Sequence, residues 1–239
     1  KMAWSVLALY AYDENPDETS LENMLRQSMQ LLARLPIIAA QSYAFNRSHF
    51  YGDSLNIHNP QLNMSTAQNF LRIMRPDCSF TEDEAKLLDL CLVLHAEHGG
   101  GNNSAFTCRV VSSSGSDTYS AIASAICSLK GPKHGGANIK VQEMFDCIKE
   151  GVSDWNDDDE ISAFLERMLL GEVGDHSGLI YGMGHAIYTL SDPRAVVLKH
   201  YAMNLAKGTE FEREFALLES VERLSPSVFA RFKQADKNI

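Results

Sequence analysis

Apolar side chains recur every three or four residues along much of the chain, which is the spacing of one buried face of an α-helix. After Ser20, whose hydroxyl is suited to cap a helix, the apolar positions include Leu21, Leu25 and Leu32. Pro36 should kink or end this helix, because proline lacks an amide hydrogen and its ring clashes with the preceding turn. The pattern therefore predicts a helix that begins after Ser20 and is perturbed at Pro36.

Capping patterns mark the starts of further helices. Ser65–Gln68 and Thr81–Glu84 both have the capping-box form, in which the first and fourth residues satisfy each other's free backbone amides. These boxes predict helices that run to Met74 and to His95. Asp117 is suited to cap a helix over 118–129, and we expect later helices over 137–149, 159–170, 192–206 and 210–224. Because no segment shows the two-residue alternation of a strand, the predicted fold class is all-α.

Composition limits the partners that this chain is expected to have. A formal net charge of -10 over 239 residues argues against non-specific binding to nucleic acid or to an anionic membrane. No apolar run is long enough to span a bilayer. The cysteines are odd in number and have no C-x-x-C spacing, so we expect reduced thiols and a cytoplasmic protein. They are Cys78, Cys91, Cys108, Cys127 and Cys147.

Three junctions of histidine with glycine carry the candidate chemistry. His98 precedes three glycines, His134 precedes two, and His185 follows Gly184. Glycine lets a ligand approach the backbone closely, and histidine moves a proton near neutral pH. With Arg194 in the Asp-Pro-Arg segment that follows, they suggest a pocket for a small anionic substrate that bears a carbonyl group. The spacing of His95 and His98 is compatible with a metal, but no nearby pair completes a site, so none is expected.

These motifs resemble those of the citrate synthases. That family carries a His-acidic-His-Gly segment, a Gly-Pro-x-His-Gly segment and a Gly-x-Gly-His segment followed by Asp-Pro-Arg, and all three occur here in that order. The resemblance extends over essentially the whole chain. It implies a citrate-synthase-like multi-helical fold, with a large-domain portion over 1–135 and an incomplete small domain over 136–239. It also implies a homodimer.

The resemblance implies a reaction and a set of roles. Citrate synthases condense acetyl-CoA, a co-substrate, with oxaloacetate to give citrate and CoA, without a permanently bound cofactor. His134 would stabilise the enolate oxygen of acetyl-CoA, and His185 would polarise the ketone of oxaloacetate. His98 and Arg194 would bind oxaloacetate carboxylates, although Arg194 could equally be a surface ion-pair residue. The segment expected to hold the CoA adenine comprises Leu179, Ile180, Tyr181, Gly182, Met183 and Gly184.

Alternatives to this reading remain open. A 2-methylcitrate synthase, which uses propionyl-CoA, would share the same histidines and differ only in its acyl pocket. The family pattern also continues into a segment with a catalytic aspartate and further arginines, and no segment here matches it. The chain is therefore expected to be an internal fragment that is inactive by itself, and an inert helical fragment that dimerises is the third interpretation.

Overall fold

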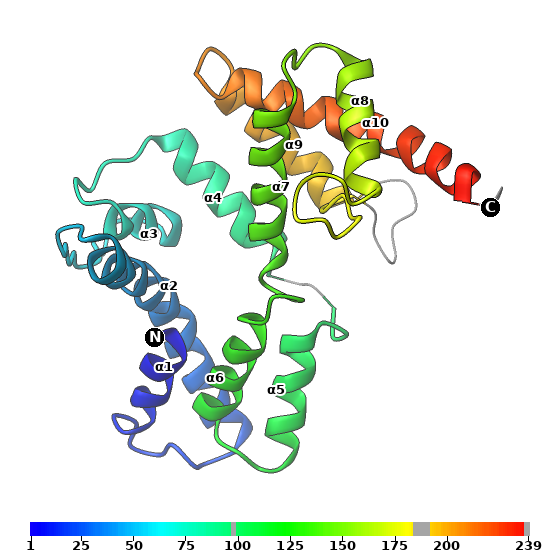
Figure 1. Cartoon of the computed structure of the whole chain (residues 1–239). Coiled ribbons are helices and arrows are strands. Elements are labelled where there is room, and N and C mark those ends of the chain that lie inside the picture. Colours follow the sequence, from blue (N-terminus) through cyan, green and yellow to red (C-terminus); the bar gives the residue numbers. More distant parts are fainter. Residues whose placement is uncertain (97–98, 184–191, 237–239) are drawn as a thin grey trace. The chain divides into compact units, whose positions relative to one another are not determined.

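The computed structural model describes residues 1–96, 99–183 and 192–236, and within these ranges every regular element is a helix (Figure 1). This confirms the all-α prediction. The helices are α1 (Met2–Tyr10), α2 (Leu21–Tyr51), α3 (Thr66–Met74), α4 (Glu82–Leu94), α5 (Asn103–Ser113), α6 (Thr118–Leu129), α7 (Ala137–Gly151), α8 (Asp158–Leu169), α9 (Pro193–Ala206) and α10 (Glu212–Asp236).

The chain divides into two compact units, Lys1–His134 and Gly135–Ile239. The first unit contains α1 to α6, in which α6 packs against both α1 and α5. The second unit contains α7 to α10, in which α8 packs against α10. Among the described residues, no helix has the length and apolar character needed to cross a membrane.

Several helix starts follow the predicted capping signals. The Ser65 hydroxyl accepts the amide of Gln68 at 3.2 Å, and the Gln68 side chain accepts the amide of Ser65 at 2.9 Å. Thr81 and Glu84 form the second capping box. Asp117 caps α6, whose bounds match the prediction. Local side-chain chemistry therefore determined these boundaries, because a satisfied first turn needs no tertiary partner.

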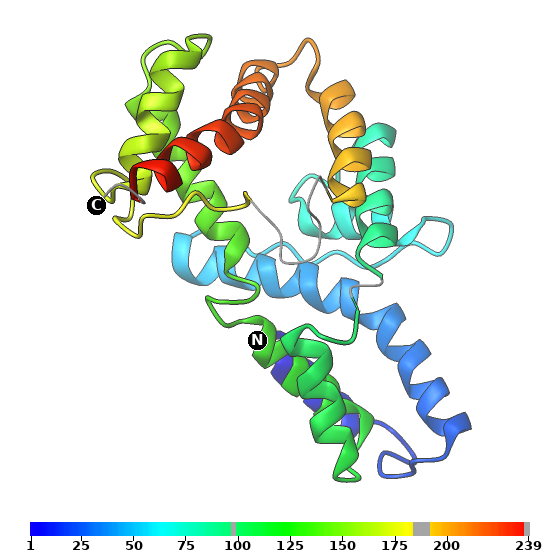
Figure 2. The ribbon, with the colours of Figure 1, turned by 90° about the vertical axis from the view of Figure 1, so that its right-hand side faces the viewer.

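The two prolines inside helices have different outcomes. Pro36 lies within α2, which continues to Tyr51 and changes direction along its length (Figure 2), so the predicted kink is present and a termination is not. The last helix was predicted to end at Leu224, which is wrong, because α10 continues through Pro226 to Asp236. Val221 and Val228, both fully buried, lie on either side of that proline. Their burial offsets the backbone hydrogen bond that proline removes.

The sequence patterns missed two helices. No prediction covered α1, whose residues are apolar on most sides and whose N-cap Lys1 offers no side-chain hydrogen bond. The start of α5 was also missed, although the Asn102 side chain accepts the amide of Ala105 at 2.8 Å. Asparagine is a good N-cap, so this signal was present at the end of the glycine run.

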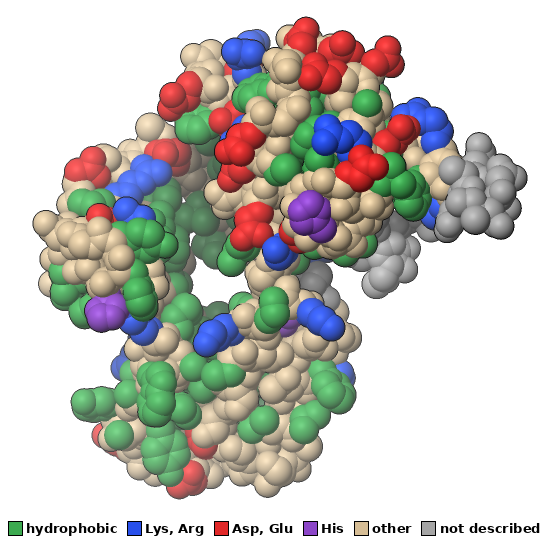
Figure 3. Space-filling view, in the orientation of Figure 1, with side chains coloured by type: hydrophobic (Ala, Val, Ile, Leu, Met, Phe, Trp, Pro, Cys, Tyr) green, Lys and Arg blue, Asp and Glu red, His purple; other side chains and the backbone are tan. Residues whose placement is uncertain are grey.

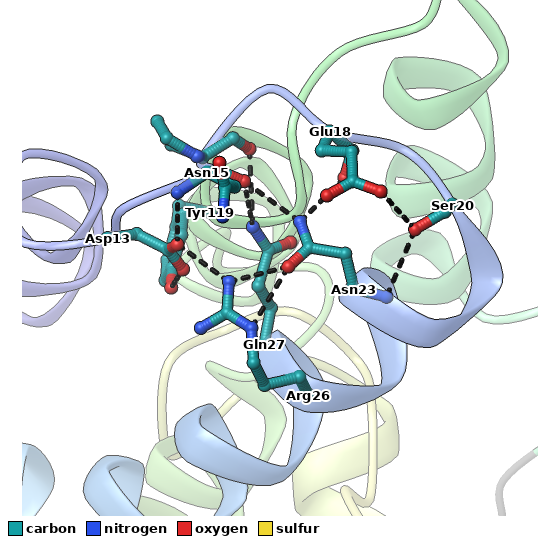
Figure 4. A network of polar contacts seen from close by, with 9 residues as sticks. Asp13, Asn15, Glu18, Ser20, Asn23, Arg26, Gln27 and Tyr119 are labelled. Atoms are coloured by element: carbon teal, nitrogen blue, oxygen red, sulfur yellow. Dashed lines mark hydrogen bonds and ion pairs between the residues drawn. The ribbon is translucent and has the colours of Figure 1, made fainter.

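A polar network joins three parts of the first unit (Figure 4). The Asp13 side chain is 1% exposed and pairs with Arg26 of α2 at 2.6 Å. Tyr119 of α6, also buried, donates its hydroxyl to Asp13 at 2.5 Å. Burial alone would raise the pKa of Asp13, but the hydrogen bonds from Arg26 and Tyr119 outweigh it and hold that pKa well below its ordinary value. The buried carboxylate therefore ties the 11–20 loop to α2 and α6.

The second unit has its own apolar core between α7, α8 and α10. Its fully buried side chains include Ile148, Ile161, Leu165 and Leu217. The first turn of α8 contains three acidic residues, Asp158, Asp159 and Glu160. Their negative charges interact favourably with the positive end of the helix dipole. Figure 3 shows acidic side chains gathered at that end of α8. The surface of the first unit differs, because large apolar side chains such as Trp4 and Tyr12 are 78% and 83% exposed on it.

Candidate active site

His134 follows α6 and is held by a serine from the neighbouring helix. Its Nε2 lies 2.8 Å from the Ser104 hydroxyl, and Ser104 stands in the first turn of α5. The same hydroxyl lies 3.0 Å from the carbonyl of Ala125 on α6. The amide of His134 donates to the Gly131 carbonyl at 3.0 Å, which closes the turn after α6. Packing of α5 against α6 therefore fixes both the backbone and one ring nitrogen of His134.

The serine has a consequence for the tautomer of His134. A hydroxyl has one proton, and here the Ala125 carbonyl and the His134 Nε2 both compete for it. When Ser104 donates to Nε2, the neutral ring carries its proton on Nδ1 and can donate from there. When Ser104 donates to Ala125, the proton of the neutral ring lies on Nε2 instead. Ser104 thus controls which nitrogen of His134 acts as a donor.

The glycine run before α5 is held by an arginine that the sequence patterns did not single out. Arg109 donates from Nη2 to the Gly100 carbonyl at 2.7 Å. The guanidinium lies beside Gly100, at 3.4 Å from where a Cβ atom would stand, which is an ordinary van der Waals distance. Arg109 therefore orders the backbone that follows His98.

Arg194 pairs with an aspartate of its own helix start. Asp192 caps α9 by accepting the amide of Arg194 at 2.9 Å. The Arg194 side chain donates to the same carboxylate, from Nη2 at 2.6 Å and from Nε at 3.0 Å. Both side chains are mostly buried. The guanidinium is thus oriented by its neighbour, and Pro193 occupies the first turn of α9, where its missing amide hydrogen costs no helical hydrogen bond.

The segment 179–183 lies against α7. Ile180 is buried, and the amide of Tyr181 donates to the sulfur of Met144 at 3.2 Å. Gly182 has a φ of +78°, and a Cβ atom there would lie 3.1 Å from Val141. Only glycine adopts this conformation at little cost in free energy, and only glycine leaves room for Val141. The backbone of the segment is therefore closely constrained.

A cavity of about 280 Å³ lies beside this segment within the second unit. Its lining residues include Lys140, Met144, Cys147, Asp175 and Tyr181. The Tyr181 hydroxyl donates to Asp175 at 2.7 Å, and Lys140 pairs with Asp175 at 3.4 Å. Hydrogen bonds from Ser177 and Tyr181 hold the pKa of Asp175 well below its ordinary value. The carboxylate is therefore ionised at neutral pH.

Three of the predicted site residues, His98, Gly184 and His185, lie outside the described residues. Within the described ranges, no group of three or more His, Cys, Asp or Glu side chains is arranged to hold a metal ion. The structure brings His134 together with Ser104, and Arg194 together with Asp192. Ser104 is the partner that sequence patterns missed, because its contact with His134 depends on helix packing.

Comparison with known proteins assigns the family. The family model described as the citrate synthase C-terminal domain matches residues 1–239. The chain belongs to the citrate synthase family. A citrate synthase of Deinococcus radiodurans is 34% identical over 212 residues, which cover 89% of this chain and 51% of that protein. The chain thus spans about half the length of such relatives.

Other similar proteins include a 2-methylcitrate synthase and a solved structure of a citrate synthase. A 2-methylcitrate synthase of Shewanella oneidensis is 33% identical over 210 residues, covering 87% of this chain and 50% of that protein. The citrate synthase of Thermoplasma acidophilum was solved as a ternary complex with carboxymethyl coenzyme A and oxaloacetate. Its structure matches 95% of this chain and 55% of its own chain, with 23% sequence identity and a TM-score of 0.72. Both units thus have the all-α fold of citrate synthases.

Proposed function

We propose that this chain belongs to an enzyme that condenses acetyl-CoA with oxaloacetate to give citrate and CoA, a reaction of the tricarboxylic acid cycle. Membership of the citrate synthase family supports this proposal. The observation that carries it is the hydrogen bond of 2.8 Å between Ser104 and His134, because His134 lies in the motif expected to act on acetyl-CoA. Acetyl-CoA is a co-substrate, and no permanently bound cofactor is proposed.

His134 would stabilise the enolate oxygen that forms when the acetyl methyl group loses a proton. That methyl group is a poor acid, so its deprotonation needs a hydrogen-bond donor at the thioester oxygen. The neutral ring offers Nδ1–H when Ser104 donates to Nε2. The role therefore needs the Ser104 hydroxyl to donate to Nε2 rather than to the Ala125 carbonyl. A carboxylate base must also take the methyl proton, and we assign that role to no aspartate of this chain.

Oxaloacetate would be held by three further residues. His185 would donate to its ketone and stabilise the alkoxide that forms as the new carbon–carbon bond is made. His98 and Arg194 would bind its carboxylates. A planar guanidinium suits a carboxylate because it offers two parallel N–H donors, and Asp192 already fixes the plane of Arg194.

The CoA adenine would lie against the backbone of 179–184. The constrained conformation of Gly182 and the burial of Ile180 support this assignment, because a preorganised backbone binds with a smaller loss of entropy. We assign 1–135 to the large domain and 136–239 to the small domain of the family fold. The active protein would be a homodimer, and its five free cysteines suit the reducing cytoplasm.

A second candidate is 2-methylcitrate synthesis from propionyl-CoA. The Shewanella oneidensis relative, at 33% identity, favours keeping it. The two reactions differ by one methylene in the acyl group, which a pocket distinguishes by only about 1–3 kcal/mol. The histidines would have the same roles in both.

A thiol-release assay on the intact natural protein tests the proposal. We expect release of CoA that requires oxaloacetate and is faster with acetyl-CoA than with propionyl-CoA. His134→Ala should lower turnover by about two to four orders of magnitude and leave oxaloacetate binding largely unchanged. His58→Ala is a matched control, because this half-buried histidine of the first unit bonds the carbonyl of Pro76 and belongs to none of the three histidine–glycine motifs. Near-normal turnover of His134→Ala would show that its assigned role is wrong.

A further inference from the structure

Tyr181 is held by polar contacts at its far end. Its hydroxyl donates to the Asp175 carboxylate at 2.7 Å and lies 3.1 Å from the Ser177 hydroxyl. Asp175 in turn accepts the amide of Ser177 at 3.1 Å, so the carboxylate also shapes its own loop. Tyr181 is thus connected to the loop before it by its side chain and to Met144 by its amide, at 3.2 Å.

The loop and α7 are linked by a lysine. Lys140, in the first turn of α7, pairs with Asp175 at 3.4 Å and with Glu143 at 2.9 Å. The hydrogen bonds that Lys140 donates to these two carboxylates raise its pKa, with Glu143 the larger influence. The Asp175 carboxylate therefore accepts a hydrogen bond from the Tyr181 hydroxyl and forms an ion pair with the Lys140 ammonium.

The adjoining cavity explains why these contacts matter. Tyr181 packs partly against the apolar core of the second unit, and together with Met144 it also lines the space of about 280 Å³. A side chain that borders open space can adopt alternative rotamers more readily than one that is packed on every side. The hydrogen bond to Asp175 therefore adds to packing in selecting the observed orientation.

We propose that Asp175 is a positioning residue for acyl-CoA binding, which fixes Tyr181 and with it the backbone of 179–183. The inference rests on the proposed role of this segment in CoA binding. Asp175 touches neither substrate in this scheme. It acts through Tyr181, whose displacement into the cavity would release the amide bond to Met144 and the contact of Gly182 with Val141.

Two variants test this role in the intact protein. Tyr181→Phe removes the hydroxyl and keeps the ring, and Asp175→Ala removes the acceptor. Asp175→Asn keeps an acceptor oxygen and should restore part of the effect. Glu172→Ala is the matched control, because Glu172 lies in the same loop and pairs with Arg167 at 3.6 Å, away from Tyr181.

The first measurement is hydrogen exchange of the free protein, followed in peptides that cover 175–183. The second is the dissociation constant of coenzyme A by calorimetry, together with KM values. We expect faster exchange in these peptides and a roughly three- to tenfold weaker binding of coenzyme A, as for a partly exposed hydrogen bond to a charged group. Saturated kcat and the KM for oxaloacetate should stay near wild type. A merely structural loss would change both KM values together.

Each other outcome overturns the inference. Unchanged exchange in Tyr181→Phe would mean that Asp175 does not hold the segment. Faster exchange with unchanged coenzyme A affinity would mean that the segment is held but does not position the ligand. Weaker binding of coenzyme A and oxaloacetate alike in Tyr181→Phe would indicate a general loss of structure. The proposed function fails separately, if the wild-type protein releases no thiol.

Discussion

Replacing Ser104 by alanine isolates the control of the His134 ring. The substitution removes the hydroxyl that lies 2.8 Å from Nε2 and 3.0 Å from the Ala125 carbonyl. It leaves the backbone turn of His134 intact, because that turn depends on the Gly131 carbonyl. We therefore expect the ring to remain in place but to lose the hydroxyl that, when it donates to Nε2, keeps the proton of the neutral ring on Nδ1.

The magnitude follows from the contact that is lost. A neutral hydrogen bond contributes about 0.5–1.5 kcal/mol net, and Ser104 is only partly buried, so the lower half of that range is the better guide. Turnover should therefore fall roughly two- to fivefold. This loss is much smaller than that of His134→Ala, because the alanine at 104 leaves the imidazole available.

The assay is steady-state thiol release with acetyl-CoA at saturating oxaloacetate. Ser113→Ala serves as the control, since Ser113 lies on the same helix and its hydroxyl bonds the Val110 carbonyl at 2.7 Å. In Ser104→Ala we expect kcat to fall while oxaloacetate affinity stays unchanged. A wild-type kcat, or a loss confined to oxaloacetate binding, would refute the reasoning about the tautomer.

Three further predictions concern stability, its pH dependence and the backbone. Tyr119→Phe removes a buried donor to Asp13 and should destabilise the first unit by about 1.5–3 kcal/mol, measured by native-state hydrogen exchange of α1 and α6 peptides. The pKa of Asp13 is lower in the folded protein, so its contribution to the free energy of unfolding is present above the unfolded pKa of 3.8 and is lost as the pH falls below it. Below pH 4, the free energy of unfolding should therefore fall more steeply in wild type than in Asp13→Asn, and equal slopes would contradict this. Gly182→Ala places a side chain at a strained φ of +78° and 3.1 Å from Val141, so it should weaken coenzyme A binding. Gly208→Ala is the control for strain alone, because Gly208 also has a positive φ but a Cβ atom there meets no atom within 4 Å.

The fold was predictable where the signal was local. Asp117 and the two capping boxes identify helix starts from four residues each, so α3, α4 and α6 were placed correctly. The end of α10 was not predictable, because the tolerance of Pro226 depends on the burial of its neighbours. Burial is a property of the packed unit and is not encoded in a short window.

In the candidate site, the residues that belong to local motifs were likewise predictable, and the contacts that depend on helix packing were not. His134 and Arg194 were identified by motifs, and the pairing of Arg194 with Asp192 joins residues two positions apart. The contact between Ser104 and His134 spans 30 residues and exists because α5 packs against α6. The role of Asp175 likewise depends on the turn that returns Tyr181 to it. Such contacts are visible only once the helices are assembled.

The division of the chain directly after His134 has a consequence for recombination. A crossover at the junction of residues 134 and 135 transfers the segment 179–183 together with Asp175, Lys140 and Tyr181, while Ser104 and His134 remain together in the first unit. Each polar cluster is thus inherited whole. Chimeras with the 2-methylcitrate synthase relative, joined at this point, would exchange the segment that we propose to bind CoA as one block without disturbing the histidine and its serine.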